Sequence, residues 1–228
     1  MKRILSALLT LVFLVPFSCA SNRSKKAERH QAAHWIIMVT RDDSGAIEEA
    51  AGCSATAIGP HTLLTAEHCY LPNETLYLDS PVGDVKSSVA FTFHPTAADF
   101  IFDHEDHMLI DVPGAHFAVY IPLKNFRTPR QGEHYYLFGN PGGITDQYRE
   151  GYVTGKTTIS AAEKGDIDAK SDALYMLVGP IVGGDSGSSI YAKNGQLIGI
   201  VTYGMGNGAF IGVFPIEFTA GQIAQSLL

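Results

Sequence analysis

The 228-residue sequence has few charges, only three cysteines, a single tryptophan and little helical periodicity. Charged residues make up 17% and hydrophobic residues 46%, so the apolar content suffices for a core and excludes a disordered chain. Lys and Arg number 16 against 23 Asp and Glu, which gives a net charge of −7. A nucleic-acid partner is therefore not expected, because such binders carry a basic excess. The composition also excludes fibrous, collagenous and multi-span membrane proteins.

The longest apolar run lies at the N-terminus. Lys2 and Arg3 precede an apolar stretch over residues 4–17, which is shorter than the about 20 residues that a membrane-spanning helix needs. Ser18, Cys19 and Ala20 then supply the small residues at which a signal peptidase cuts. We predict a signal peptide over residues 1–20, no membrane span and a secreted or periplasmic protein. The alternative is a lipoprotein anchored through Cys19, and both interpretations export the chain.

Two cysteines remain after residue 20. Cys53 and Cys69 are candidates for a disulfide, because exported proteins meet an oxidising compartment. A closed loop of about 15 residues would contribute roughly 3 kcal/mol in the chain-entropy model. Two buried free thiols are the alternative.

Short β-rich runs dominate the rest of the chain. Residues 21–33 are polar and mostly basic and are predicted to be a tether. From residue 34, apolar runs such as residues 34–40, 62–65 and 117–122 alternate with turns rich in Gly and Pro, which predicts a sandwich or barrel. Helical periodicity is strong only at the end, where Phe218, Ile223 and Leu227 share one face. The gap between Thr65 and Ser186 suggests two half-domains with a site between them.

Three local motifs carry candidate chemistry. They are Leu63-Leu64-Thr65-Ala66-Glu67-His68-Cys69, Asp106-His107-Met108-Leu109-Ile110 and Gly183-Gly184-Asp185-Ser186-Gly187-Ser188. A serine hydroxyl needs a base in order to attack a carbonyl, and an imidazole oriented by a buried carboxylate suits that task. The glycines would let the N–H groups of Gly184 and Ser186 converge on a developing oxyanion.

Each motif also has a structural interpretation. His68 could be a packed core histidine, Asp106 a turn acid and Ser186 an ordinary turn serine. An α/β-hydrolase places Ser before Asp and His, and no histidine follows His134, so that class is excluded. The sequence has no His-Glu-x-x-His motif, and the acids and histidines at 104–107 lack paired-ligand spacing, so we predict no metal and no cofactor.

The ordered motifs resemble those of the chymotrypsin-like (trypsin-fold) serine peptidases, over about residues 34–228. Residues 65–69 look like the family's Thr-Ala-x-His-Cys box, residues 106–110 like its Asp-x-x-Leu-Ile strand, and residues 184–187 are its nucleophile motif. The resemblance implies an all-β fold of two antiparallel six-stranded barrels, at about residues 34–125 and 126–228, with a C-terminal helix. It implies a cleft between the barrels in which His68 is the general base, Asp106 its orienting acid and Ser186 the nucleophile.

The same resemblance implies a substrate-binding strand over residues 197–204. Thr202, Tyr203 and Gly204 would pair with an extended protein or peptide substrate. Pro180 stands where trypsin-like members carry a pocket Asp, so we expect an uncharged pocket that prefers apolar or small side chains. Its lining is predicted to be Pro180, Ile181, Thr202, Tyr203 and Gly204.

Several positions depart from the family. Asp103 and Asp111 also lie near the expected acid position, and the Ile-Val-Gly-Gly start that follows zymogen cleavage is absent. The chain looks closest to compact bacterial members, although Val201 and Thr202 stand where the glutamyl endopeptidases carry a histidine. The sequence thus predicts a secreted serine endopeptidase of undetermined oligomeric state. A non-catalytic trypsin-fold binding module and a self-processing protease remain open alternatives.

Overall fold

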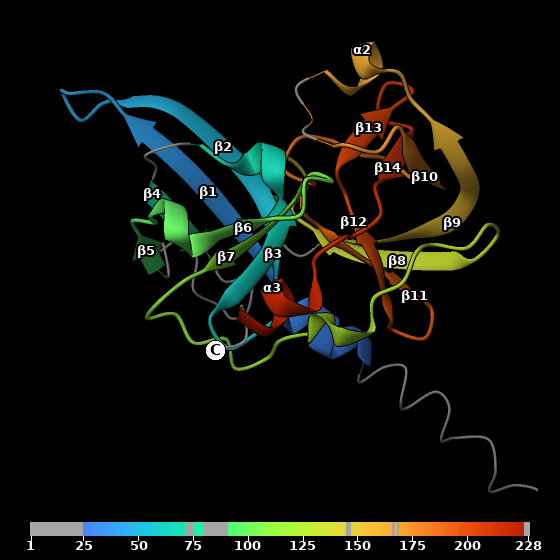
Figure 1. Cartoon of the computed structure of the whole chain (residues 1–228), viewed down its shortest axis with the longest axis horizontal. Helices are drawn as coiled ribbons and strands as arrows, with labels where there is room; N and C mark the ends of the chain where they lie inside the picture. Colours follow the sequence, from blue (N-terminus) through green and yellow to red (C-terminus); the bar gives the residue numbers. More distant parts are fainter. Residues whose placement is uncertain are drawn as a thin grey trace, which may run out of the picture.

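The computed structural model describes residues 25–71, 75–79, 91–144, 147–165, 167 and 169–225. The predicted signal peptide and Cys19 lie outside these residues. Among the described helices, none is long and apolar enough to cross a membrane. Antiparallel strands are the main regular elements of the described chain, and they divide into two sheets that curl into two barrel-like halves (Figure 1).

The first sheet has the strand order β5-β4-β1-β2-β3-β7-β6. Its strands are β1 (Ala33–Arg41), β2 (Ile47–Ala57), β3 (Thr62–Ala66), β4 (Thr75–Asp79), β5 (Phe91–Phe93), β6 (Phe100–Phe102) and β7 (His107–Asp111). Strand β1 alternates buried and partly exposed residues over much of its length, whereas β3 is buried throughout because β2 and β7 flank it. This pairing places the ends of β3 and β7 side by side, with Ala66 opposite His107.

The second sheet has the order β12-β11-β8-β9-β10-β14-β13. Its strands are β8 (His134–Gly139), β9 (Gln147–Thr158), β10 (Ala173–Val178), β11 (Ser189–Ala192), β12 (Leu197–Ile200), β13 (Tyr203–Met205) and β14 (Phe210–Val213). Strand β13 ends the sheet, so one of its edges faces away from the other strands. Such an edge can accept another strand.

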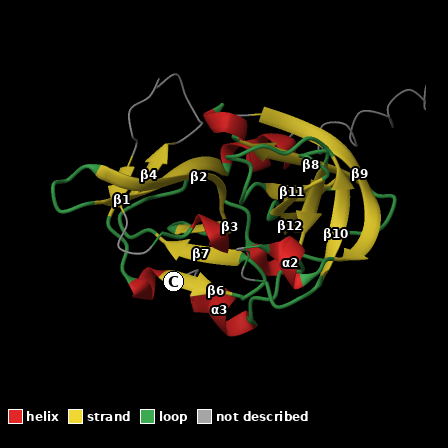
Figure 2. Cartoon of the chain, turned by 90° about the horizontal axis from the view of Figure 1, so that it is seen from above, coloured by secondary structure: helices red, strands yellow, loops and turns green. Residues whose placement is uncertain are grey.

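Short helices connect and close the sheets. They are η1 (Glu67–Cys69), η2 (Ala97–Asp99), η3 (Leu123–Asn125), η4 (Pro141–Gly143), α2 (Ala161–Lys164) and α3 (Ala220–Gln225). The C-terminal helix α3 is the closing helix expected from the sequence, and it lies against the first sheet (Figure 2). Phe218 is buried in the first core and Ile223 packs on it, so the C-terminal segment leaves the second sheet and packs on the first half.

The sequence expectations fail in three places. The run at 117–122 is not a strand; Phe117 and Ile121 are buried but donate only single backbone bonds, to Pro60 and Ala57, and Pro122 has no N–H to donate. Each sheet has seven strands instead of six, because three-residue strands form at the edges. Residues 25–31, expected within a tether, are helical.

The N-terminal helix, residues 25–31, packs on the second barrel. The Arg29 guanidinium donates two hydrogen bonds to the Gly195 carbonyl, at 2.9 and 3.1 Å. The Lys26 ammonium lies 4.6 Å from the centroid of the Tyr148 ring, within cation–π range. The basic residues that suggested a solvated tether are therefore held by aromatic rings and turn carbonyls.

Candidate active site

The three candidate catalytic side chains come from the ends of different elements. His68 lies in η1, directly after the buried strand β3, and Asp106 directly precedes β7. Ser186 lies in the turn before β11. Because β3 and β7 are paired, His68 and Asp106 leave the first sheet at the same end. The Glu67 N–H donates to the Asp106 carbonyl at 3.1 Å and extends that pairing.

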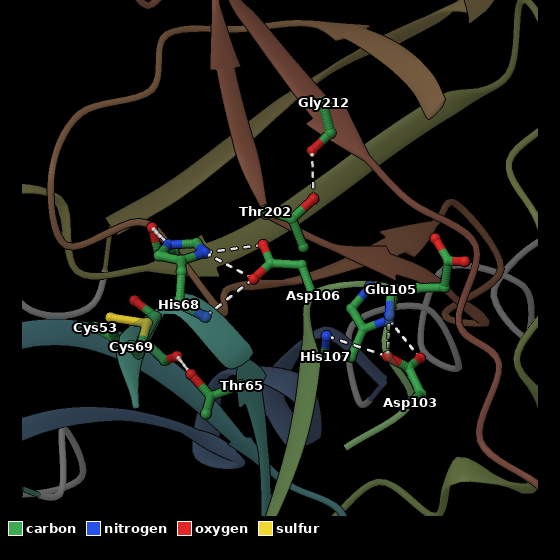
Figure 3. A network of polar contacts seen from close by, with 12 residues as sticks. Cys53, Thr65, His68, Cys69, Asp103, Glu105, Asp106, His107, Thr202 and Gly212 are labelled. Atoms are coloured by element: carbon green, nitrogen blue, oxygen red, sulfur yellow. Dashed lines mark hydrogen bonds and ion pairs between the residues drawn. A yellow bond between two sulfur atoms is a disulfide. The ribbon is translucent and has the colours of Figure 1, made fainter. Parts of the chain in front are cut away.

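The structure brings these side chains into one hydrogen-bonded row. Nδ1 of His68 lies 2.8 Å from Oδ2 and 3.0 Å from Oδ1 of Asp106 (Figure 3). Nε2 of His68 lies 2.8 Å from Oγ of Ser186. The backbone N–H of His68 also donates to Oδ1 of Asp106 at 2.9 Å, which fixes the carboxylate relative to the ring. This is the arrangement in which an imidazole can take a hydroxyl proton while a carboxylate stabilises the resulting imidazolium.

Burial differs along the row. The Asp106 side chain is fully buried, whereas the His68 side chain is 27% exposed. Asp106 has a φ of 63°, a left-handed backbone that non-glycine residues adopt rarely and that here turns its carboxylate toward His68. Thr202 is buried, and its hydroxyl donates to the Gly212 carbonyl at 3.2 Å (Figure 3). The His68 ring is thus accessible to solvent, whereas the Asp106 carboxylate that holds it is buried.

Both barrels hold the turn that carries Ser186. From the first barrel, the Ser54 N–H donates to the Ser186 carbonyl and the Ser54 hydroxyl to the Gly184 carbonyl, both at 2.8 Å. From the second barrel, the Gly187 N–H donates to Val201 at 2.8 Å. Gly187 has a φ of 82°, and a Cβ there would lie 2.0 Å from the Ser54 carbonyl oxygen. Only glycine fits this position, so the turn and the first barrel meet backbone to backbone.

The two predicted oxyanion donors are oriented by a neighbouring turn. The Gly142 N–H donates to the Gly183 carbonyl at 2.7 Å, so the Gly184 N–H of the same planar peptide points the opposite way. The N–H groups of Gly184 and Ser186 donate to no acceptor among the described residues. They remain available for a developing negative charge.

Asp185, between those two donors, forms a buried ion pair with Arg149 of β9. Nη1 of Arg149 donates to Oδ2 of Asp185 at 2.7 Å, and Nη2 donates to Oδ1. Nη1 also donates to the Pro180 carbonyl at 2.9 Å, and the Val182 N–H donates to Asp185 at 3.0 Å. The Asp185 side chain is fully buried and that of Arg149 is 18% exposed. A bidentate pair of this kind fixes the position of Asp185 within the turn.

The expected disulfide is present. Cys53 of β2 and Cys69 of η1 are bonded, with their Cα atoms 6.4 Å apart. The bridge joins the residue before Ser54 to the residue after His68. It therefore ties His68 to the strand whose Ser54 holds the turn of Ser186.

The predicted binding residues lie in or near β13 and have different partners. A Cβ on Gly204 would lie 3.3 Å from Cγ2 of Ile181, so these two residues are in contact. Tyr203 begins β13, and its hydroxyl donates to the Glu163 carbonyl. Thr202 is buried and its hydroxyl is used within the barrel, so its side chain is directed away from a substrate on that edge. Pro180 offers its carbonyl to Arg149.

The other acids near the expected position have different partners. Asp103 accepts from Nδ1 of His107 at 2.6 Å, away from His68, and Asp111 is exposed at the end of β7. Glu105 is buried and accepts two hydrogen bonds from the Ser171 N–H and one from its hydroxyl, all at 3.1 Å, which joins the two barrels. Burial raises the pKa of Glu105, and the Ser171 hydrogen bonds oppose this. Among the described residues no group of acids, histidines and cysteines could hold a metal ion.

Comparison with known proteins agrees with this geometry. The model of the family described as "Trypsin-like peptidase domain" matches residues 53–200, more than half of the chain. The chain belongs to the trypsin-like peptidase family. No curated relative matches it in sequence.

Solved peptidases share the fold of this trypsin-like peptidase. The active form of the Rv3671c protease from M. tuberculosis has a TM-score of 0.64 and 19% identity, with 91% of this chain and 84% of that chain covered. The HtrA-type protease AlgW, solved with a tripeptide, has a TM-score of 0.61 and 16% identity, with coverages of 90% and 62%. Tobacco etch virus protease with product has a TM-score of 0.59 and 14% identity, with coverages of 86% and 78%. At these identities the likeness concerns the fold.

Sequence reasoning missed three residues of this trypsin-like site. Arg149 was not singled out, because nothing local links it to Asp185, 36 positions away. Ser54 and Asn140 were not singled out either. Asn140 donates to the Ser54 hydroxyl at 3.0 Å and begins the turn that orients Gly183. The Asn-Pro-Gly-Gly sequence at 140–143 was the available signal, since consecutive glycines mark backbone that must approach another backbone.

Proposed function

We propose that the protein is an exported serine endopeptidase that cleaves proteins or peptides by acyl transfer. The observation that carries the proposal is the position of the His68 ring, 2.8 Å from both the Asp106 carboxylate and the Ser186 hydroxyl. A nucleophile, a base and an orienting acid in this order are what acyl transfer requires. The Cys53–Cys69 disulfide supports export, because such bonds persist in oxidising compartments.

The chemistry would proceed in two halves. Ser186 attacks the scissile carbonyl while Nε2 of His68 takes its proton, and Asp106 stabilises the imidazolium. The N–H groups of Gly184 and Ser186 bind the oxyanion, and His68 then returns the proton to the leaving amine, which gives an acyl-enzyme. Water attacks that ester through the same base and releases the acid. No cofactor takes part in these steps.

The acyl part of the substrate would pair with β13. Strand β13 ends its sheet, and main-chain pairing along a free edge holds a substrate whatever its side chains. The predicted pocket residues Pro180, Ile181, Tyr203 and Gly204 carry no charged side chain. We expect this pocket to prefer apolar or small side chains before the scissile bond. A peptide-library profile dominated by Lys, Arg or Glu at that position would contradict this.

The decisive test of the function is a pair of assays on the exported chain and its Ser186→Ala variant. Fluorophosphonate probes should label the unaltered protein and leave Ser186→Ala unlabelled, and casein hydrolysis should fall by roughly a millionfold in kcat, the loss typical of removing such a nucleophile. A protein that neither labels nor cleaves would be a binding module with a trypsin fold. Labelling without turnover of general substrates would indicate a self-processing protease.

A further inference from the structure

The only tryptophan of the chain lies against the backbone of residues 183–188, the turn that carries Ser186, called the nucleophile turn below. Trp35 belongs to β1 and is partly exposed. A Cβ on Gly184 would lie 3.1 Å from Cζ3 of its indole, and a Cβ on Gly52 would lie 2.7 Å from Cη2 and Cζ2. A Cβ on Gly143 would lie 3.9 Å from Cζ2. The indole thus occupies space that glycines from three different segments leave open.

The position of Trp35 is fixed by strand register. It pairs with Ser54, the residue that donates to the carbonyls of Ser186 and Gly184. The indole therefore lies on the first-barrel side of the turn. Its strand partner, Ser54, is the residue that bonds the turn. A flat ring held this way offers a rigid apolar surface at low entropic cost.

The opposite side of the same turn is bonded to Val201, in the short segment between β12 and β13. The Gly187 N–H donates to Val201, and the Val201 N–H donates to Ser188 at 2.9 Å. A substrate whose acyl part pairs with β13 reaches Ser186 from the second barrel. If its chain after the scissile bond passes Gly184 toward the first barrel, it meets the indole of Trp35.

Two further exposed apolar residues are sequence neighbours of the glycines in these turns. Ile144 follows Gly143 in the chain and is 63% exposed, and Val182 precedes Gly183 and is 54% exposed. Large exposed apolar residues that border a reactive centre typically mark a binding surface. Nothing in the chemistry of Ser186, His68 and Asp106 requires them.

We propose that Trp35 is a specificity-determining residue that binds an apolar side chain within the first two residues after the scissile bond. The inference rests on the proposed function and adds a preference on the leaving-group side, which the triad does not specify. The preferred substrate class is a protein or peptide with an aliphatic or aromatic residue just after the cleaved bond. The contact of that side chain with the indole, Ile144 and Val182 removes apolar surface from water.

The test uses quenched fluorogenic peptides that are identical before the scissile bond. One peptide carries Leu or Phe in the two positions after the bond, and the other carries Asp or Gly there. The ratio of their kcat/KM values should be about 10-fold or more in favour of the apolar peptide, the discrimination expected of an apolar pocket. In Trp35→Ala the ratio should fall to within about 2-fold of unity, and Trp35→Phe should retain most of it.

The matched control is Ile47→Ala. Ile47 is an exposed apolar residue at the start of β2, six positions from Cys53, and its replacement should leave the ratio unchanged. Fluorophosphonate labelling of each variant reports whether the nucleophile is intact. If Trp35→Ala does not label because it is misfolded, the kcat/KM ratio of Trp35→Phe is compared with that of the unaltered protein instead. A labelled enzyme with no apolar preference, or with a preference that survives in Trp35→Ala, overturns the proposal while the proposed function stands. A chain that neither labels nor cleaves overturns both.

Discussion

We predict that replacing Arg149 by methionine destabilises the protein and disables the nucleophile turn. Methionine keeps much of the side-chain length and removes the charge. The fully buried Asp185 carboxylate would lose both guanidinium hydrogen bonds and keep, among the described residues, only the bond from the Val182 N–H. Removing one partner of a buried ion pair typically costs about 3–5 kcal/mol, because the other charge is left without compensation.

The same free energy has a consequence for activity. Asp185 lies between Gly184 and Ser186, the two predicted oxyanion donors, so a turn that moves to relieve the unpaired carboxylate should displace them. If about 3 kcal/mol of that cost falls on the active arrangement of the turn, the labelling rate falls by roughly 100-fold, since each 1.4 kcal/mol corresponds to a factor of 10. Urea unfolding followed by fluorescence measures the stability, and the rate of fluorophosphonate labelling measures the turn.

Two companion variants separate charge from packing. Arg149→Lys keeps the charge but cannot donate in the bidentate geometry, so its losses should be intermediate. In the double variant Arg149→Met with Asp185→Asn the buried charge is gone, and most of the lost stability should return. An Arg149→Met protein that unfolds at the wild-type urea concentration and labels at the wild-type rate would refute the reasoning.

Two further predictions concern stability alone. Replacing Cys53 and Cys69 together by alanine should lower the free energy of unfolding by about 3 kcal/mol, the value for a loop of about 15 residues, and thiol reduction of the unaltered protein should reproduce the loss in urea melts. Burial lowers the pKa of His34 from its ordinary value of 6.5 to about 4. The unfolded chain then binds a proton that the folded chain resists, so stability present above pH 6.5 should decline by about 3 kcal/mol as the pH falls to 4. A His34→Leu variant should lack that decline, and an identical pH dependence in both proteins would contradict the assignment.

The chemistry of the candidate site could be predicted because each of its groups lies in a short motif. His68, Asp106 and Ser186 each adjoin a strand of clear apolar character, and their order along the chain excludes competing hydrolase classes. The disulfide could be predicted from compartment and cysteine number alone. The catalytic role of these residues stays a prediction, whereas their meeting in one row is a feature of the structure.

The contacts that hold those motifs could not be predicted, because they depend on how distant strands pair. Arg149 reaches Asp185 because β8 and β9 pair with Leu137 opposite Arg149, and because Gly139 has no side chain; a Cβ there would lie 2.8 Å from Nη2 of Arg149. The sequence pattern of β9 does not distinguish Arg149 from its neighbour Glu150, which interacts with Tyr148 and His134 at the surface. The N-terminal helix was missed for a similar reason, since its basic residues find rings and carbonyls that are distant in sequence.

The nucleophile turn shows why both barrels are needed for one site. Its carbonyls accept from Ser54 of the first barrel, its Asp185 carboxylate from Arg149 of the second, and the Gly183 carbonyl from the η4 turn that follows β8. Each bond constrains a different group of the turn, so no single barrel can set the direction of the Ser186 hydroxyl and of the Gly184 and Ser186 N–H groups together. Glu105 and Ser171 add a second connection between the barrels, on the other side of Asp106. The distance from His68 to Ser186 is therefore a property of how the barrels pack, and changes at the barrel interface should alter the chemistry without touching any of the three reactive side chains.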